Sequence, residues 1–184
     1  MGKKIKIILG ILAIFMIVEN IGYGESLTEE KEEIYMDKID NNAESDGDIN
    51  MSGEIGVKVE NGKEEIIKGN NITITGDNGN GVHTISQQKE SPSTIIIEGK
   101  GKVTITGQEV GVNIVKSEGN ISGENIELIG KEMNGVSLGD GAEITINGTE
   151  SLDISAGWSG LYFSNSKGDI SSKVINIVGG SNGA

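Results

Sequence analysis

The chain has 184 residues, with 29 glycines, one proline and no cysteine, and its formal net charge at pH 7 is −13. The acidic balance argues against binding to nucleic acid or to anionic lipid headgroups, because both are negatively charged. The absence of cysteine excludes a disulfide scaffold and a lipid anchor on cysteine. Abundant glycine with a single proline predicts many tight corners.

Residues 1–24 have the pattern of a secretory signal peptide. Three lysines lie within the first six residues, Ile7–Val18 is an apolar run, and small residues precede a cleavage position after Gly24. The apolar run is shorter than the about 20 residues that a membrane-spanning helix needs. We expect a cleaved leader, export, and no integral membrane span in the mature chain. A retained N-terminal anchor is the alternative.

Residues 25–48 differ in composition from the rest of the chain. They carry ten acidic residues and two lysines, and Ser26–Glu29 matches the capping box of a helix. The apolar residues Leu27, Ile34 and Ile39 line a stripe too thin to bury much surface. We expect an acidic linker that is partly helical or disordered.

Residues 49–184 repeat one sequence pattern, in which two short strands flank a glycine corner. The clearest copy is Lys102–Ser117, KVTITGQEVGVNIVKS, in which apolar and polar residues alternate as in a half-buried strand. The residue after the second glycine of each copy marks the alignment, at Val82, Val112, Val136 and Leu161. A weaker third strand lies between the copies, at residues 93–99, 120–122, 142–148 and 168–171.

A repeat of roughly 20–30 residues with three short strands predicts a solenoid. We predict an all-β fold, a right-handed parallel β-helix of about four to five three-strand coils, incomplete at the C-terminus. Val82, Val112, Val136 and Leu161 form its internal ladder. We expect residues 49–69 to be an irregular first coil, whose polar cover comes from Glu54, Glu60, Glu64 and Glu65. An antiparallel sandwich or barrel is the alternative, which corners at matching positions of a long repeat disfavour.

The acidic residues of the repeat come singly, which argues against catalysis. Glycoside hydrolysis needs two carboxylates about 5–10 Å apart; Asp140 and Glu143 lie near each other in sequence, but acidic residues at corners are usually solvated turn residues. The chain also has no arginine to act as a lyase base. We expect no enzyme activity, no catalytic residue, no bound metal and no cofactor. His83, the single histidine, is expected to be a solvated surface imidazole.

The aromatic cluster AGWSGLYF contains the best candidates for ligand contact. Phe163 alternates with Leu161 and is expected to stack inside the coil. Trp158 falls on a corner and Tyr162 faces outward, where aromatic rings stack on sugars or anchor a protein partner. Packing of Trp158 back onto its own coil is the alternative.

The lysine-rich leader, the acidic segment and the cysteine-free repeats of the form [VI]-T-I-T-G…G-V carry a family resemblance. Together they resemble the N-terminal part of the passenger region of type V autotransporters, adhesin-like proteins of AT-rich Gram-negative bacteria. The resemblance implies a non-catalytic, adhesin-like or structural protein that is exported to the cell surface, associated with the outer membrane or released outside the cell.

The partners that this resemblance implies are the export machinery, which would act on the leader, and a glycan or protein on the surface of a host or neighbouring cell. Two other functions stay open at this point. One is a polysaccharide-active β-helix enzyme, and the other is a truncated gene product without independent function.

Overall fold

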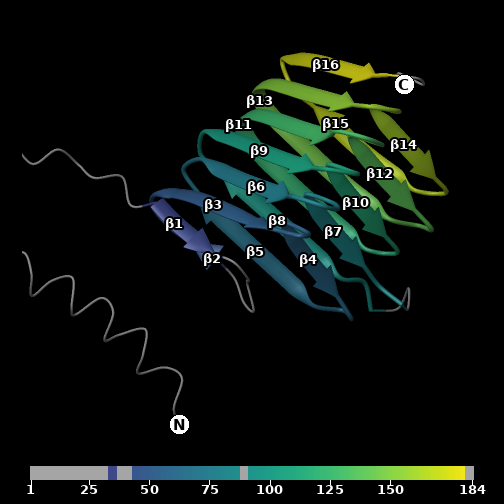
Figure 1. Ribbon diagram of the computed structural model, residues 1–184, viewed down its shortest axis with the longest axis horizontal. Coiled ribbons are helices and arrows are strands. Elements are labelled where there is room, and N and C mark those ends of the chain that lie inside the picture. Colours follow the sequence, from purple (N-terminus) through teal and green to yellow (C-terminus); the bar gives the residue numbers. More distant parts are fainter. Residues whose placement is uncertain (1–32, 37–42, 88–90, 181–184) are drawn as a thin grey trace, which may run out of the picture. The chain divides into compact units, whose positions relative to one another are not determined.

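The computed structural model describes residues 33–36, 43–87 and 91–180. These residues wind into an all-β parallel solenoid of about five turns (Figure 1). The predicted repeat fold is therefore confirmed, and the right-handed winding stays a prediction. The described residues include no helix, and hence none long and apolar enough to cross a membrane. The expected leader, residues 1–24, lies outside the described residues.

Each full turn contributes a strand to each of three faces, which we call faces A, B and C. Face A contains β3 (Asp48–Gly53), β6 (Ile72–Gly76), β9 (Lys102–Gly107), the second halves of β11 (Glu118–Gly130) and β13 (Glu143–Ala156), and β16 (Val174–Gly179). Face B contains β4 (Val57–Glu60), β7 (Val82–Ile85), β10 (Val112–Val115), β12 (Val136–Gly139) and β14 (Leu161–Ser164). Face C contains β2 (Ala43–Glu44), β5 (Glu64–Gly69), β8 (Thr94–Gly99), the first halves of β11 and β13, and β15 (Lys167–Ser171).

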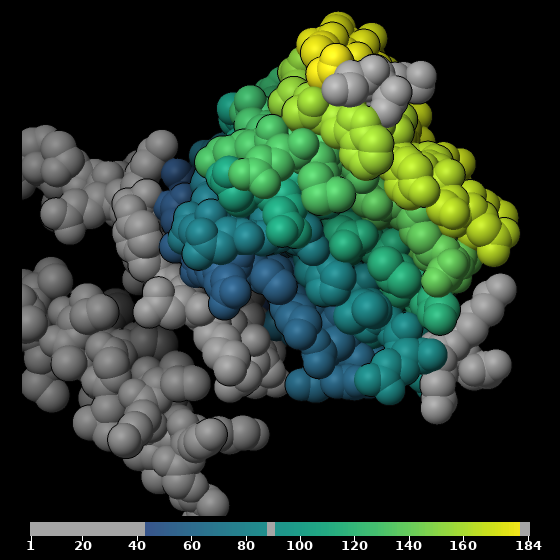
Figure 2. All heavy atoms as spheres, turned by 45° about the vertical axis from the view of Figure 1, so that its right-hand side comes forward, coloured from purple at the N-terminus to yellow at the C-terminus, as the bar shows by residue number. Residues whose placement is uncertain are grey.

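Strands of successive turns pair in parallel, so equivalent residues of the repeat stand side by side. The residues aligned from the sequence form one row of face B, Val82, Val112, Val136 and Leu161. The row starts one turn earlier than the sequence suggested, because Val57 pairs with Val82. The weak third strand is present in every turn as face C. Figure 2 shows the turns following one another as bands of colour from blue to yellow.

The core is made of inward-facing aliphatic side chains stacked from turn to turn. In face A, Ile74, Ile105 and Leu128 stand in register and have no exposed surface. Their strand neighbours Thr73 and Thr104 alternate with them and face outward. Complete burial of one such aliphatic side chain stabilises the fold by about 1.5–3 kcal/mol, so these rows supply the main drive to fold.

The N-terminal part of the solenoid differs from the sequence prediction. Strands β1 (Glu33–Met36) and β2 lie within the segment that we expected to be linker, and they pair with β3 and β5. Glu65, expected to cover the end of the ladder, is only 7% exposed and points inward. The reason is the two-residue period of a strand: Ile67 faces the core, so Glu65 faces it too.

The corners of the coil are of two physical kinds. Between faces A and B, glycine permits a close backbone approach: a Cβ on Gly107 would lie 1.9 Å from the carbonyl oxygen of Val110. Between faces B and C, the corner residue instead adopts the left-handed conformation. Among the described residues, the non-glycine residues with positive φ are Asn61, Lys116, Asp140 and Asn165, each directly after a face B strand. Asparagine and aspartate tolerate this conformation better than most side chains do.

The two glycines Gly107 and Gly139 provide a matched test of close approach. Gly107→Ala is expected to lower the free energy of unfolding by about 3 kcal/mol, because the new methyl group overlaps a fixed carbonyl oxygen. Gly139→Ala is expected to change it by less than about 1 kcal/mol, because no atom lies within 4 Å of a Cβ placed there. Urea denaturation measures the free energy of unfolding of both variants. Equal losses of stability would contradict the conclusion that the corner needs glycine because the backbone approaches closely there.

Candidate functional site

Trp158 and Tyr162 present exposed aromatic surface on the last turns of the solenoid. Trp158 lies at the corner between β13 and β14, where its amide donates to the carbonyl oxygen of Met133 at 2.8 Å. Tyr162 lies on β14, in the outward row that also contains Ser137. The exposed fractions are 45% for Trp158 and 51% for Tyr162. Both side chains are thus about half exposed, on a backbone that hydrogen bonds and strand pairing hold in place.

Phe163 does not belong to this exposed aromatic pair. It stands in the inward row with Leu138, and its ring occupies the space beside Gly168, where an added Cβ would lie 2.6 Å from Cε2. Its side chain is nevertheless 40% exposed, because β14 is the last strand of face B in the described chain. Phe163 therefore helps to close the last turn from within.

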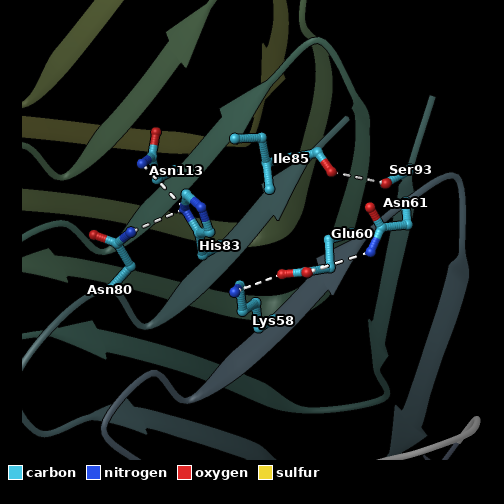
Figure 3. Close-up of polar contacts among 8 residues, drawn as sticks. All are labelled: Lys58, Glu60, Asn61, Asn80, His83, Ile85, Ser93 and Asn113. Carbon is cyan, nitrogen blue, oxygen red and sulfur yellow. Dashed lines mark hydrogen bonds and ion pairs between the residues drawn. The ribbon is translucent and has the colours of Figure 1, made fainter. Parts of the chain in front are cut away.

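His83 lies at the centre of the best-defined polar cluster (Figure 3). Its Nδ1 atom is 3.0 Å from Nδ2 of Asn80 and 3.2 Å from Nδ2 of Asn113. Since both amide nitrogens are donors, Nδ1 accepts, and the proton of the neutral ring resides on Nε2. The ring is half-buried, so the expectation of a solvated imidazole was wrong. Asn80 holds it from the corner and Asn113 from the next turn.

Charged side chains of β4 border this cluster. Lys58 precedes His83 in the outward row of face B, and its Nζ atom is 2.5 Å from Oε2 of Glu60. Burial lowers the pKa of His83 below 6.5, and the nearby positive charge of Lys58 lowers it further. The hydrogen bond and charge of Lys58 likewise lower the pKa of Glu60. The geometry thus favours a neutral imidazole beside a salt bridge.

The two carboxylates considered for glycoside hydrolysis each lie near a lysine. Asp140 is 4.0 Å from Nζ of Lys116, and Glu143 is 3.0 Å from Nζ of Lys167. Within residues 33–36, 43–87 and 91–180, no group of three or more histidine, cysteine, aspartate or glutamate side chains is arranged to hold a metal ion.

His83 was predicted to lie in an outward row, which is correct, but its hydrogen bonds with Asn80 and Asn113 were not predicted. The aligned rows already put Asn113 next to His83. The contribution of Asn80 depends on how the corner directs its side chain, which repeat spacing does not specify.

Comparisons with protein-family models, curated proteins and solved structures found no match to this chain.

His83 makes the stability of the solenoid depend on pH. Since its folded-state pKa lies below 6.5, its stabilising contribution is complete above about pH 6.5 and is lost as the pH falls through that lowered pKa. We expect the free energy of unfolding to decrease from pH 7 to pH 5, above the range in which exposed carboxylates titrate. His83→Gln is expected to flatten this decrease, because glutamine is polar but does not titrate.

Urea denaturation at several pH values measures this dependence, and the proton NMR signal of the single histidine reports its pKa directly. A titration midpoint at or above 6.5, or an unchanged pH dependence in the variant, would contradict the account.

Proposed function

We propose that the chain is a non-catalytic passenger fragment of the type V autotransporter class, exported and used for contact outside the cell. The observation that carries the proposal is a cysteine-free parallel solenoid with two aromatic rings, Trp158 and Tyr162, open on its outer surface. A solenoid of this kind offers flat, regular faces on which binding groups recur at a fixed spacing of about 4.8 Å.

The distribution of side chains supports contact with a neutral or weakly polar ligand. The outward rows of face A are rich in threonine and asparagine, such as Thr73, Thr104 and Asn125, which donate and accept hydrogen bonds without charge. The aromatic rings supply apolar surface at low entropic cost. The net charge of −13 repels acidic polymers. We therefore propose neutral surface glycans as the ligand class, with a protein surface as the alternative.

The export part of the proposal is tested with the full chain and its own leader in a Gram-negative host. The mature protein is expected outside the cytoplasm, and its measured mass is expected to match a chain that begins at Glu25. Leu12→Asp interrupts the apolar run of the leader, so this variant is expected to remain in the cytoplasm as the uncleaved precursor. Uncleaved wild-type chain confined to the cytoplasm would overturn the export proposal.

The contact part is tested by retention on immobilised neutral polysaccharides, with acidic polysaccharides in parallel. Trp158→Ala and Tyr162→Ala are each expected to weaken retention about tenfold, since exposed aromatic residues commonly dominate recognition. Ser137→Ala is the matched control. Ser137 stands next to Tyr162 in the same outward row, and this variant is expected to bind as strongly as the wild type. Equal binding by all variants would exclude this aromatic site.

The same assay distinguishes catalysis from binding. Release of reducing ends or unsaturated sugars by the wild type, lost in Asp140→Asn or Glu143→Gln, would contradict the non-catalytic assignment.

A further inference from the structure

Five asparagine–glycine pairs lie in the part of the chain that the structure describes, and this dipeptide has a chemistry of its own. Asparagine is among the thermally labile residues. A glycine that follows it has no side chain to shield its backbone nitrogen, and this nitrogen can attack the side-chain amide of the asparagine. The five pairs are Asn61-Gly62, Asn78-Gly79, Asn80-Gly81, Asn134-Gly135 and Asn147-Gly148.

The structure holds the glycine amide in place at three of these pairs. The amides of Gly81 and Gly135 donate to carbonyl oxygens of the next turn, each at 3.0 Å. The amide of Gly62 donates to Oγ of Ser93 at 3.1 Å. A nitrogen whose hydrogen is engaged in this way can attack only after the local structure opens, so reaction at these three pairs is slow in the folded chain.

The pair Asn147-Gly148 is held by its strand. It lies within β13, which pairs with β11 on one side and with β15 on the other. Gly148 is buried, and the side-chain oxygen of Asn147 accepts a hydrogen bond from Oγ of Ser171 at 3.2 Å. Ring closure there requires the strand to leave its extended form, which again demands local opening.

Asn78-Gly79 has none of these restraints. It lies at the corner between β6 and β7, where Asn78 is exposed. Among the described residues, no donor bonds to the carbonyl oxygen of Asn78 and no acceptor bonds to the amide of Gly79. The peptide unit that joins the two residues is therefore the one best able to tilt into the conformation that ring closure needs.

The next turn explains why this peptide unit is unpaired. The amides of Gln108 and Glu109, which are consecutive, donate to the carbonyl oxygens of Gly76 and Gly79, both at 3.0 Å. The two residues between these glycines, Asp77 and Asn78, consequently have no counterpart in the next turn. They form a small loop on a corner whose two ends are fixed.

We propose that Asn78 is a self-modification site, which deamidates in the folded chain without an enzyme and yields isoaspartate and aspartate. The nitrogen of Gly79 gives its proton to a solvent base, and its electron pair forms a bond with Cγ of Asn78. The bond from Cγ to Nδ2 breaks, and Nδ2 leaves as ammonia with a proton from solvent. Water then opens the succinimide ring at either carbonyl carbon. One asparagine and one water thus give one acid and one ammonia, and no oxidant or reductant is needed.

The modification changes both charge and backbone. Each event adds one carboxylate, so the formal net charge goes from −13 to −14. Opening of the ring at the backbone carbonyl also adds a methylene group to the main chain. The altered backbone adjoins Asn80, whose Nδ2 is 3.0 Å from Nδ1 of His83, so the NMR signal of His83 is expected to shift. The proposal does not depend on the proposed export or on glycan binding.

The first test compares the five pairs in the full chain, incubated at mildly alkaline pH either folded or in urea. Trypsin cleaves after Lys68 and Lys89, so Asn78 and Asn80 share one peptide, in which fragment masses separate the two sites. In the folded chain, Asn78 is expected to convert at least about tenfold faster than each of the other four asparagines. In urea the restraints are gone, and the difference is expected to shrink to a few-fold.

Two variants test the cause of the difference. Gly79→Ala is expected to slow conversion of Asn78 at least about tenfold, because a methyl group shields the attacking nitrogen. A Cβ there lies 3.3 Å from its nearest atom, the carbonyl oxygen of Glu54, so the variant fits with a small shift. Ser93→Ala is the converse: it removes the acceptor of the Gly62 amide and is expected to speed conversion of Asn61 while leaving Asn78 unchanged.

Conversion of Asn78 no faster than that of the other four asparagines in the folded chain would overturn the proposal. So would a folded chain that stays intact at Asn78 while the chain in urea converts. The comparison of folded and unfolded wild type decides the matter even if Gly79→Ala fails to fold.

Discussion

The structure depends on one constraint, that equivalent residues of successive turns stand directly next to one another. Parallel pairing brings Ile74, Ile105 and Leu128 into a single buried row, and none of the three has any exposed surface. Because each turn is only three short strands, its apolar face cannot be buried within that turn alone. Stability therefore comes from the stack, and a turn is stable only when its neighbours are in register.

The corners of the coil keep successive turns in register although the turns differ in length. Gly107 lets the backbone turn sharply without displacing the strands on either side, and Lys116 and Asp140 make the next corner by adopting the left-handed conformation. Outward positions carry no such restriction and are free to hold functional groups. Trp158 and Tyr162 are exposed on the outer surface, and the hydrogen bond between His83 and Asn113 links two adjacent turns.

The repeat spacing was sufficient to predict the solenoid, its three strands per turn and the outward position of His83, because stacking imposes a strict period. The inward direction of Glu65 was not predicted, since two adjacent glutamates beside two isoleucines leave the phase of the strand ambiguous. Strands β1 and β2 were missed because their acidic surroundings conceal a very short pairing.

The most direct test of the account is a through-space NMR measurement of backbone contacts around Asn113. The account predicts contacts from Asn113 to His83 of the preceding turn and to Ser137 of the following turn, both in parallel orientation. An antiparallel sandwich or barrel would instead place Asn113 opposite a strand adjacent in sequence, with close contacts to residues such as Thr106. Observation of that second pattern would contradict the stacked register on which every other conclusion rests.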